Sequence, residues 1–208
     1  MNLFDYLWNV IQLPVYLMLL LGTIGTMFIN TLFLRPIPLS TYYVKDIFGN
    51  IYADTTSGCF DVCFGNTYSP LRVSNKKLFK VLTISFPFSF GSRIISSEYA
   101  IDTKQVFFRN KRIAEADPES FRAIGYQLGK DKNRYFLYEF PLERYLTENI
   151  DPSNTITQEP FEVIAYDPST YIIIKQKDAY YSVKLNPQPT SITQISADSA
   201  KTYSPIEN

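Results

Sequence analysis

The segment YAIDTKQVFFRNKRIAEADPESFRAIGYQLGKDKNRYF, from Tyr99 to Phe136, decides the fold class of this chain. It contains two short aromatic runs, VFF and YF, and each run follows an aspartate (Asp102 or Asp131) after a short polar step. An aspartate at a strand end can close an Asx turn, and the run that follows suits a strand with one ring on each sheet face. The segment therefore predicts repeated β-hairpins.

The linker between these two hairpins contains Asp117-Pro118, which predicts a turn or the start of a short helix, and a further helical turn is predicted near Pro160-Phe161. Asp117 is suited to cap the first free N–H groups, and Pro118 fits the first helical position, where no N–H is needed. Phe121 follows one turn later and is expected to enter the core. Because buried aromatic side chains usually belong to the core, we expect the linker and hairpin motifs to specify the fold.

Similar hairpins flank this segment on both sides. YYVKDIFGNIYADTT (residues 42–56) and TYIIIKQKDAYYSVKL (residues 170–185) each place a polar turn between two strand-like runs. A second pattern, Phe-charged-apolar-aliphatic, begins at Phe79, Phe121 and Phe161, which are 42 and 40 residues apart. We interpret it as an internal repeat with equivalent buried phenylalanines. Since one unit cannot bury its aromatic face alone, stacked units are expected to share a core.

These motifs resemble the repeat of the DKNYY family, a bacterial family without an established activity. The name-giving motif stands as DKNRYF from Asp131, and ADPESF from Ala116 matches the family's linker, within a clear match over residues 99–136. The chain departs from the family after the aromatic pair, where Arg109-Asn110 and Leu137-Tyr138 replace the usual Asn-Gly. The resemblance implies an exported, envelope-associated domain. The motif residues, all predicted to be structural, are Asp102, Phe107, Phe108, Asp117, Pro118, Phe121, Asp131, Lys132, Asn133, Tyr135 and Phe136.

The N-terminal segment has the composition of a membrane anchor. From Tyr6 to Leu34 there are 29 consecutive residues without a charge, and a bilayer span needs roughly 20 mostly apolar residues. Pro36 and Pro38 follow and are expected to stop the helix. A cleaved signal peptide is the alternative, but no Lys or Arg precedes the apolar stretch and no small-x-small cleavage site follows it. The sequence predicts one transmembrane helix within an anchor of residues 1–38.

The remainder divides into a β-repeat domain over residues 39–185 and a tail over residues 186–208. The tail is rich in Pro, Ser and Thr and is predicted to be flexible. The 20 basic and 20 acidic residues of the whole chain are unevenly distributed, because residues 72–134 carry 13 basic and 6 acidic ones. This basic segment is predicted to face anionic lipid or an acidic partner, with simple protection of exposed strand edges as the alternative.

The composition excludes most known enzymatic sites. The chain has no histidine, and it contains no P-loop, GxGxxG or GxSxG motif. We therefore predict no enzymatic activity, no catalytic residue, no cofactor and no metal site. Cys59 and Cys63 are the only cysteines. They are a disulfide candidate if the domain is exported, and two free thiols are expected if it is cytoplasmic.

The predicted function is that of a membrane-anchored envelope protein whose β-repeat domain binds a protein partner or joins a membrane assembly, including an immunity-type role. The alternative is a domain that binds carbohydrate or a small molecule through exposed aromatic rings, possibly with an enzymatic activity; nucleic acid is not expected. Rings in a concave groove would favour this alternative, and buried rings the first function. The expected location is the bacterial inner membrane with the domain outside the cytoplasm, although Arg35 and Lys45 near the span favour the cytoplasmic side.

Overall fold

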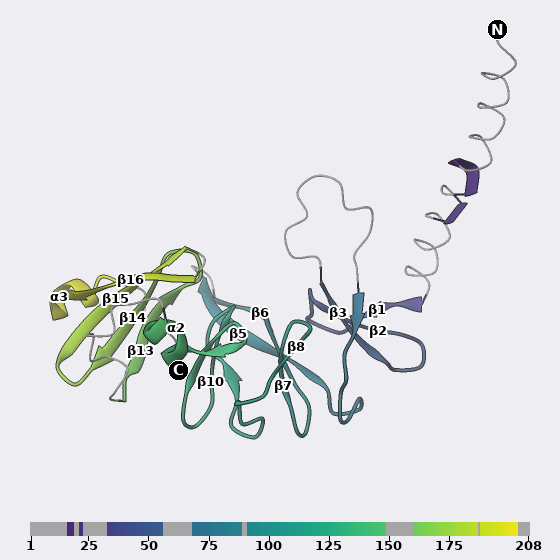
Figure 1. Cartoon of the computed structure of the whole chain (residues 1–208), viewed down its shortest axis with the longest axis horizontal. Coiled ribbons are helices and arrows are strands. Elements are labelled where there is room, and N and C mark those ends of the chain that lie inside the picture. Colours follow the sequence, from purple (N-terminus) through teal and green to yellow (C-terminus); the bar gives the residue numbers. More distant parts are fainter. Residues whose placement is uncertain are drawn as a thin grey trace, which may run out of the picture.

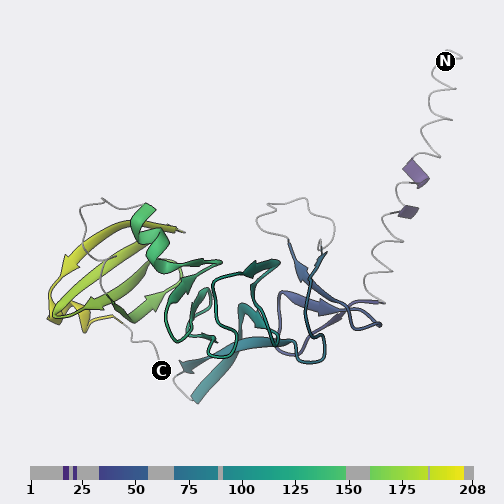
Figure 2. The same ribbon diagram turned by 60° about the horizontal axis from the view of Figure 1, so that its bottom comes forward.

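A computed structural model describes the chain over residues 16–18, 21–22, 33–55, 68–88, 91–148, 160–186 and 188–203. In these ranges the strands form four antiparallel sheets of four strands each. Within every sheet, strands that are neighbours along the chain are also neighbours in space. The sheets follow one another along the long axis of the molecule (Figures 1 and 2). The chain is thus mainly β, as the hairpin pattern predicted.

Short strands build the first and third sheets, whereas the second contains the two longest strands, which have 9 and 11 residues. The first sheet contains β1 to β4, which are Arg35–Pro36, Tyr43–Lys45, Ile51–Asp54 and Tyr68–Pro70. The second contains β5 to β8, which are Lys80–Phe88, Gly91–Ile101, Val106–Phe108 and Lys111–Ile113. The third contains β9 to β12, which are Arg122–Ala123, Leu128–Lys130, Tyr135–Leu137 and Phe140–Pro141. The fourth contains β13 to β16, which are Glu162–Asp167, Tyr171–Gln176, Ala179–Asn186 and Gln188–Ile195. Helix α2 is Leu142–Glu148 and helix α3 is Ala197–Ala200.

This topology places the connections of each sheet at two opposite ends. The turn between the second and third strands lies at one end, which we call the middle-turn edge, and it comprises residues 46–50, 102–105, 131–134 and 177–178. The described residues that connect the first to the second and the third to the fourth strands lie at the other end, the outer-turn edge, and they are residues 37–42, 55, 109–110, 124–127, 138–139 and 168–170. All four hairpins predicted from the sequence are the second and third strands of a sheet.

The predicted repeat is present, because Phe79, Phe121 and Phe161 each immediately precede the first strand of a sheet. Their predicted equal burial is wrong: Phe121 is buried, whereas the other two are half-buried. The Phe121 ring lies close to the β10 backbone, since a Cβ atom at Gly129 would come within 2.3 Å of its Cζ. At the same register position the second sheet has Ala100, whose methyl group occupies this space.

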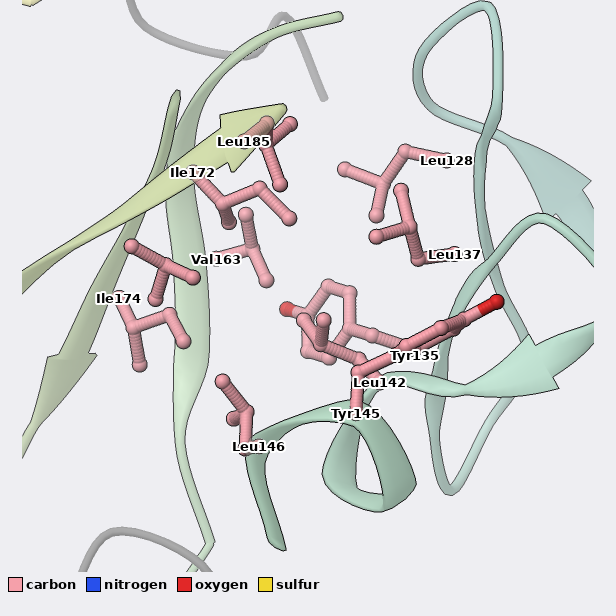
Figure 3. Close-up of a cluster of buried hydrophobic side chains, with 11 residues drawn as sticks. Leu128, Tyr135, Leu137, Leu142, Tyr145, Leu146, Val163, Ile172, Ile174 and Leu185 are labelled. Atoms are coloured by element: carbon pink, nitrogen blue, oxygen red, sulfur yellow. The ribbon is translucent and has the colours of Figure 1, made fainter. Parts of the chain in front are cut away.

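The core lies between successive sheets, as expected for units that cannot bury their aromatic face alone. Between the second and third sheets, Phe121 packs against Tyr99 and Phe136 with ring centroids 5.2 and 5.6 Å apart. Between the third and fourth sheets, Leu128 and Leu137 face Val163, Ile172 and Leu185, and α2 covers this cluster with three side chains (Figure 3). Those three are Leu142, Tyr145 and Leu146.

The C-terminal segment corrects the prediction of a flexible tail over residues 186–208. Residues 188–195 form β16, which pairs with β15 from Asn186↔Gln188 to Tyr180↔Ile195. Helix α3 follows, and the hydroxyl of its N-cap Ser196 accepts a hydrogen bond from Ser199 N at 3.1 Å. The prediction from composition was wrong because the edge of β15 has backbone N–H and C=O groups with which even a polar segment can pair as an edge strand. Within the tail, residues 204–208 lie outside the described ranges.

Most of the predicted membrane segment also lies outside the described residues. Residues 16–18, 21–22 and 33 are helical. In the part of the chain that the structure describes, no helix has the length and apolar character needed to cross a bilayer. The disulfide candidates Cys59 and Cys63 lie in residues 56–67, which are outside the described ranges as well.

Candidate functional site

An open cleft of about 910 Å³ runs along the outer-turn edge. It is lined by turns from all four sheets, and none of its lining residues comes from a described middle turn. Representative lining residues are Thr55 of the first sheet, Arg109 of the second, Tyr126 and Tyr138 of the third, and Ser169 and Gln188 of the fourth. The cleft is therefore a product of the stacking and belongs to no single sheet.

A buried carboxylate organises the middle of this edge. The Glu98 side chain on β6 is 0% exposed, and it is paired with Arg109 Nε through its Oε2. Its Oε1 accepts hydrogen bonds from Gln127 Nε2 at 2.9 Å and from Tyr42 OH at 3.3 Å. Tyr42 OH also lies 2.5 Å from Tyr126 OH. Because a buried charge is costly unless it is paired and hydrogen-bonded, this network ties three sheets to one geometry.

The Arg109 side chain is held in its charged form at the cleft. Its guanidinium carbon lies 5.2 Å from the ring centroid of Tyr42 and 5.6 Å from that of Phe108, which are cation–π distances. Burial lowers the pKa of Arg109, but the hydrogen bond and the charge of Glu98 outweigh it, so the pKa is raised. The side chain remains 29% exposed. Arg109 is thus a fixed, partly exposed cation at the cleft.

The tyrosine hydroxyls of this network stay protonated. Burial, the hydrogen bond with Tyr126 and the negative charge of Glu98 raise the pKa of Tyr42. Burial and the same carboxylate raise the pKa of Tyr43, whose hydroxyl donates to Glu98 O at 2.9 Å. These groups therefore act as neutral hydrogen-bonding hydroxyls, since neither can ionise near neutral pH.

Two cleft residues have a left-handed backbone, Arg109 with φ 50° and Tyr138 with φ 56°. This conformation costs an L-residue about 1–2 kcal/mol. Arg109 N donates to Glu98 O at 3.0 Å, and Tyr138 N donates to Gln127 O at 3.0 Å. These are the turns at which the chain departs from the family's Asn-Gly pattern. The departure therefore places a guanidinium and a phenol ring where the family usually has small turn residues.

Tyr99 joins the second and third sheets beneath these turns. Its hydroxyl lies 2.7 Å from Gln127 O, 2.9 Å from Tyr138 O and 3.2 Å from Phe136 O. The ring is buried, and burial raises the pKa of the hydroxyl, so it remains a donor. The two outer turns of the third sheet are thereby held to β6.

The motif aspartates lie at the other end, the middle-turn edge. Asp131 Oδ1 accepts hydrogen bonds from Asn133 N and Arg134 N, both at 2.8 Å, and Asp102 Oδ1 accepts one from Lys104 N at 2.8 Å. The Asx turns predicted at both positions are present. Each second carboxylate oxygen binds the preceding linker: Ser74 N donates to Asp102 at 2.6 Å, and Asp117 N donates to Asp131 at 3.0 Å.

The remaining motif residues surround these turns or fill the core between sheets. Lys132 and Asn133 are exposed in their turn, and Pro118 is half-buried. The buried rings of the motif are Phe107, Phe108, Phe121, Tyr135 and Phe136.

Of the two structures predicted for Asp117-Pro118, a turn or a helix start, the turn is present over residues 118–120. The helical turn predicted near Pro160-Phe161 is absent from the described residues there, because β13 begins at Glu162. Asp117 Oδ2 accepts a hydrogen bond from Ser120 Oγ at 2.6 Å and pairs with Lys132 Nζ at 3.2 Å. These two contacts lower the pKa of Asp117. The chain has no room for a helix here because β9 begins at Arg122.

Sequence reasoning missed the Glu98 network entirely. Glu98 was one of six acidic residues in a basic segment, and its partners lie 11, 29 and 56 positions away. The available signal was Arg109, a bulky cation at a turn position that favours glycine or asparagine. Across the described ranges, no group of three or more His, Cys, Asp or Glu side chains is placed to hold a metal ion.

The described residues thus form stacked four-stranded meanders with a polar, aromatic cleft along one edge. A family model matches residues 41–140, and it describes the DKNYY family. These residues match the family that the motifs at Asp102 and Asp131 indicated. The matched range runs from just before β2 to the start of β12, and the fourth sheet follows it. No curated protein and no solved structure matches the chain.

Proposed function

We propose that the chain is a membrane-anchored, non-enzymatic envelope protein whose β-repeat domain binds a protein partner in the outer-turn cleft. The observation that carries the proposal is the cleft of about 910 Å³, which is bounded by turns of all four sheets. The buried pairing of Glu98 with Arg109 keeps its centre in one conformation. A surface fixed in advance loses little conformational entropy on binding, which favours recognition.

The chemistry of the cleft supports binding over catalysis. The Arg109 charge is balanced by Glu98, and the raised pKa of Tyr42 keeps its hydroxyl protonated. A general base or an activated nucleophile needs a group that can change its protonation near the working pH. The network supplies none among its described members.

A protein partner fits the residue types that line the cleft. Tyr126, Tyr138 and Phe140 are half-buried rings, and Arg109 lies among them. Tyrosine and arginine supply much of the binding energy at protein interfaces. The motif rings are buried in the core, as expected for the protein-binding function, whereas the three rings of the cleft meet the criterion for the carbohydrate alternative.

The anchor in this proposal is the charge-free stretch from Tyr6 to Leu34, with the domain outside the cytoplasm and Cys59 joined to Cys63. The apolar stretch supports a bilayer span by its length. Since β1 begins at Arg35, the domain would follow the span without a linker. An immunity-type role, in which the anchored domain blocks a toxin at the membrane, is one form of this function.

A second candidate is a carbohydrate or another polar small molecule. The observation that favours it is the grouping of half-buried rings with side-chain amides, which include Asn110, Gln127 and Gln188. A few placed polar groups beside aromatic walls are typical of small-ligand sites.

The test is co-purification of the full chain from membranes in mild detergent. We expect a stoichiometric protein partner with the wild type and at least a tenfold loss with Tyr138→Asn, because asparagine keeps the left-handed turn but removes the ring. Lys177→Asn is the matched control, since Lys177 has φ 51° in an exposed middle turn. A wild-type chain that purifies alone, or a Tyr138→Asn variant that retains the partner, contradicts the proposal. Glycan binding that Tyr138→Asn abolishes would establish the second candidate instead.

A further inference from the structure

We infer that the middle-turn edge of the first two sheets rests on an anionic lipid surface, with the Phe48 ring inserted among the lipid headgroups. This inference rests on the membrane anchoring of the proposed function and adds the orientation of the domain. It depends on three features of this edge: its position beside the start of the domain, its exposed apolar side chains and its cations.

The chain enters the domain at this edge. Arg35, the first residue of β1, pairs with Lys45 at the end of β2, and Lys45 pairs with Ile51 at the start of β3. The turn over residues 46–50 therefore lies beside the point where the apolar N-terminal segment ends. A span that ends at Leu34 would bring this turn to the level of the headgroups.

The tip of this turn exposes apolar side chains that the domain does not cover. Phe48 is 81% exposed and Ile47 is 52% exposed. The turn is well formed, because Asp46 Oδ1 accepts hydrogen bonds from Phe48 N at 2.9 Å and Asn50 N at 2.8 Å, and Gly49 supplies the required φ of 77°. The ring is thus held outward by a closed turn, and aromatic rings favour the membrane interface.

Exposed lysines lie in or beside these two middle turns and in the linker that contacts both of them. Lys76 Nζ donates to Asn50 Oδ1 in the first middle turn, while Ser74 N donates to Asp102 in the second. The linker over residues 72–78 therefore joins both turns, and it also exposes Leu78 (58%). The exposed cations of this surface are Arg35, Lys45, Lys76, Lys77 and Lys104.

The carboxylates of these two turns do not present a matching negative surface. Asp102 is 4% exposed and is bonded to Ser74 N and Lys104 N. Asp46 is half-buried, and its second oxygen accepts from Asn50 Nδ2 at 2.7 Å and Tyr52 OH at 3.1 Å. Exposed lysines around an apolar tip are attracted to anionic lipid.

The third sheet shows that the positive surface is confined to the anchor side. There the cations are paired within the domain: Lys132 with Asp117 at 3.2 Å, and Arg134 with Glu115. Since the cleft lies at the opposite, outer-turn edge, a domain resting on its first two middle turns would open the cleft toward the aqueous side. The inferred orientation therefore leaves the cleft accessible to a partner.

Fluorescence of a tryptophan placed at the tip tests this contact in the full chain. The only tryptophan, Trp8, is changed to phenylalanine, and Phe48→Trp is added. The protein is reconstituted into phosphatidylcholine vesicles with or without phosphatidylglycerol. We expect a blue-shifted emission that brominated lipids quench and iodide does not, and a stronger effect with phosphatidylglycerol. Leu39→Trp in the same background is the control, since Leu39 is 64% exposed in an outer turn of the same sheet; it should remain accessible to iodide.

Charge variants separate lipid electrostatics from insertion alone. In the Phe48→Trp background, the triple change Lys45→Gln, Lys76→Gln and Lys104→Gln should abolish the difference between the two vesicle types. The control changes three other exposed cations, Arg112, Lys184 and Lys201, to glutamine and should preserve it.

The outcomes distinguish this inference from the anchoring on which it rests. If the protein floats with vesicles while the tryptophan at position 48 stays accessible to iodide, the lipid contact is wrong and the anchor stands. A tryptophan that becomes protected only when an acidic protein is added shows a protein-docking edge and also overturns the lipid contact. Failure to float with either vesicle type overturns both proposals.

Discussion

The two ends of the stacked sheets solve the same problem, closing a turn between antiparallel strands, by different means. At the middle-turn edge an aspartate binds backbone groups a few residues away, as Asp131 does with Asn133 N and Arg134 N. At the outer-turn edge, Arg109 and Tyr138 take left-handed conformations and are held by groups on other strands. Both arrangements repeat between the second and third sheets, because Arg109 N and Tyr138 N donate to the equivalent carbonyls of Glu98 and Gln127. Only the Glu98 side-chain network is assembled once by the stack.

This difference indicates which end is structural and which is available for function. An edge whose polar groups bind one another within a turn holds its shape independently of its neighbours, and its aspartates have little capacity left for a ligand. The outer-turn edge is held instead by the buried Glu98 carboxylate, whose partners come from three sheets. Left-handed residues do not distinguish the two ends, because Lys177 in a middle turn also has a φ of 51°. Four changes, in order of decreasing effect, test this comparison.

Arg109→Ala should have the largest effect, because it breaks the outer-turn edge at its centre. The variant leaves the Glu98 carboxylate, which is 0% exposed, without its counter-ion. Breaking a buried ion pair in this way costs about 3–5 kcal/mol. Chemical denaturation of the full chain in detergent measures the loss, and the double variant Arg109→Ala/Glu98→Gln should recover part of it. A loss below about 1 kcal/mol would show that the network does not organise this edge.

Asp131→Ala tests the middle-turn edge and should cost about 2–3 kcal/mol, because three backbone donors lose their acceptor. These are the N–H groups of Asn133, Arg134 and Asp117. The control is Asp178→Ala, an exposed position in the middle turn of the fourth sheet, with an expected change within about 0.5 kcal/mol. Equal effects of the two changes in the same denaturation experiment would contradict a special role for the motif aspartate.

Tyr99→Phe tests whether the two outer turns of the third sheet depend on β6. The hydroxyl lies among three carbonyl oxygens, so its removal should cost about 1–2 kcal/mol. Amide hydrogen exchange should also increase at Tyr138 N, which donates to Gln127 O. Tyr135→Phe is the control, since its hydroxyl contacts only the partly exposed Lys130 Nζ among the contacts described. Unchanged hydrogen exchange at Tyr138 N would show that these outer turns do not depend on the Tyr99 hydroxyl.

Glu143→Gln should have the smallest effect and the opposite sign. None of the described residues donates a hydrogen bond to Glu143 Oε2, and burial raises the pKa of this carboxyl above its ordinary 4.5. When folding raises the pKa of a carboxyl group, the group stabilises the folded state at pH values below its unfolded-state pKa. This stabilisation is lost as the pH rises through the folded-state pKa. The variant should therefore be more stable than the wild type at pH 7, by about 0.5 kcal/mol after solvent screening. Thermal unfolding of the variant and the wild type at pH 7 and at pH 4 checks this. A gain in stability that persists at pH 4 would contradict the prediction.

Much of the middle-turn edge was predictable from local sequence. The hairpins around Asp102 and Asp131, the stacking of similar units and the family followed from short motifs, because each depends on residues a few positions apart. The C-terminal strand β16 did not follow, since its Pro, Ser and Thr content is typical of a tail. Residues 188–195 form a strand because they pair with the edge of β15. The unequal burial of Phe79 and Phe121 also depended on tertiary packing, because the third sheet has Gly129 at the register position where the second sheet has Ala100.

The sequence by itself determined a mainly β chain of repeated hairpins, because the i to i+2 hydrogen bonds of aspartate and the alternation of aromatic residues act within one turn. The tertiary structure alone decided where the cleft forms. The cleft exists only after four sheets stack, and its central contacts join residues up to 84 positions apart, as between Tyr42 and Tyr126. Such contacts leave no local pattern, since the residue types that make them are ordinary until the fold buries the Glu98 side chain, which then needs polar partners.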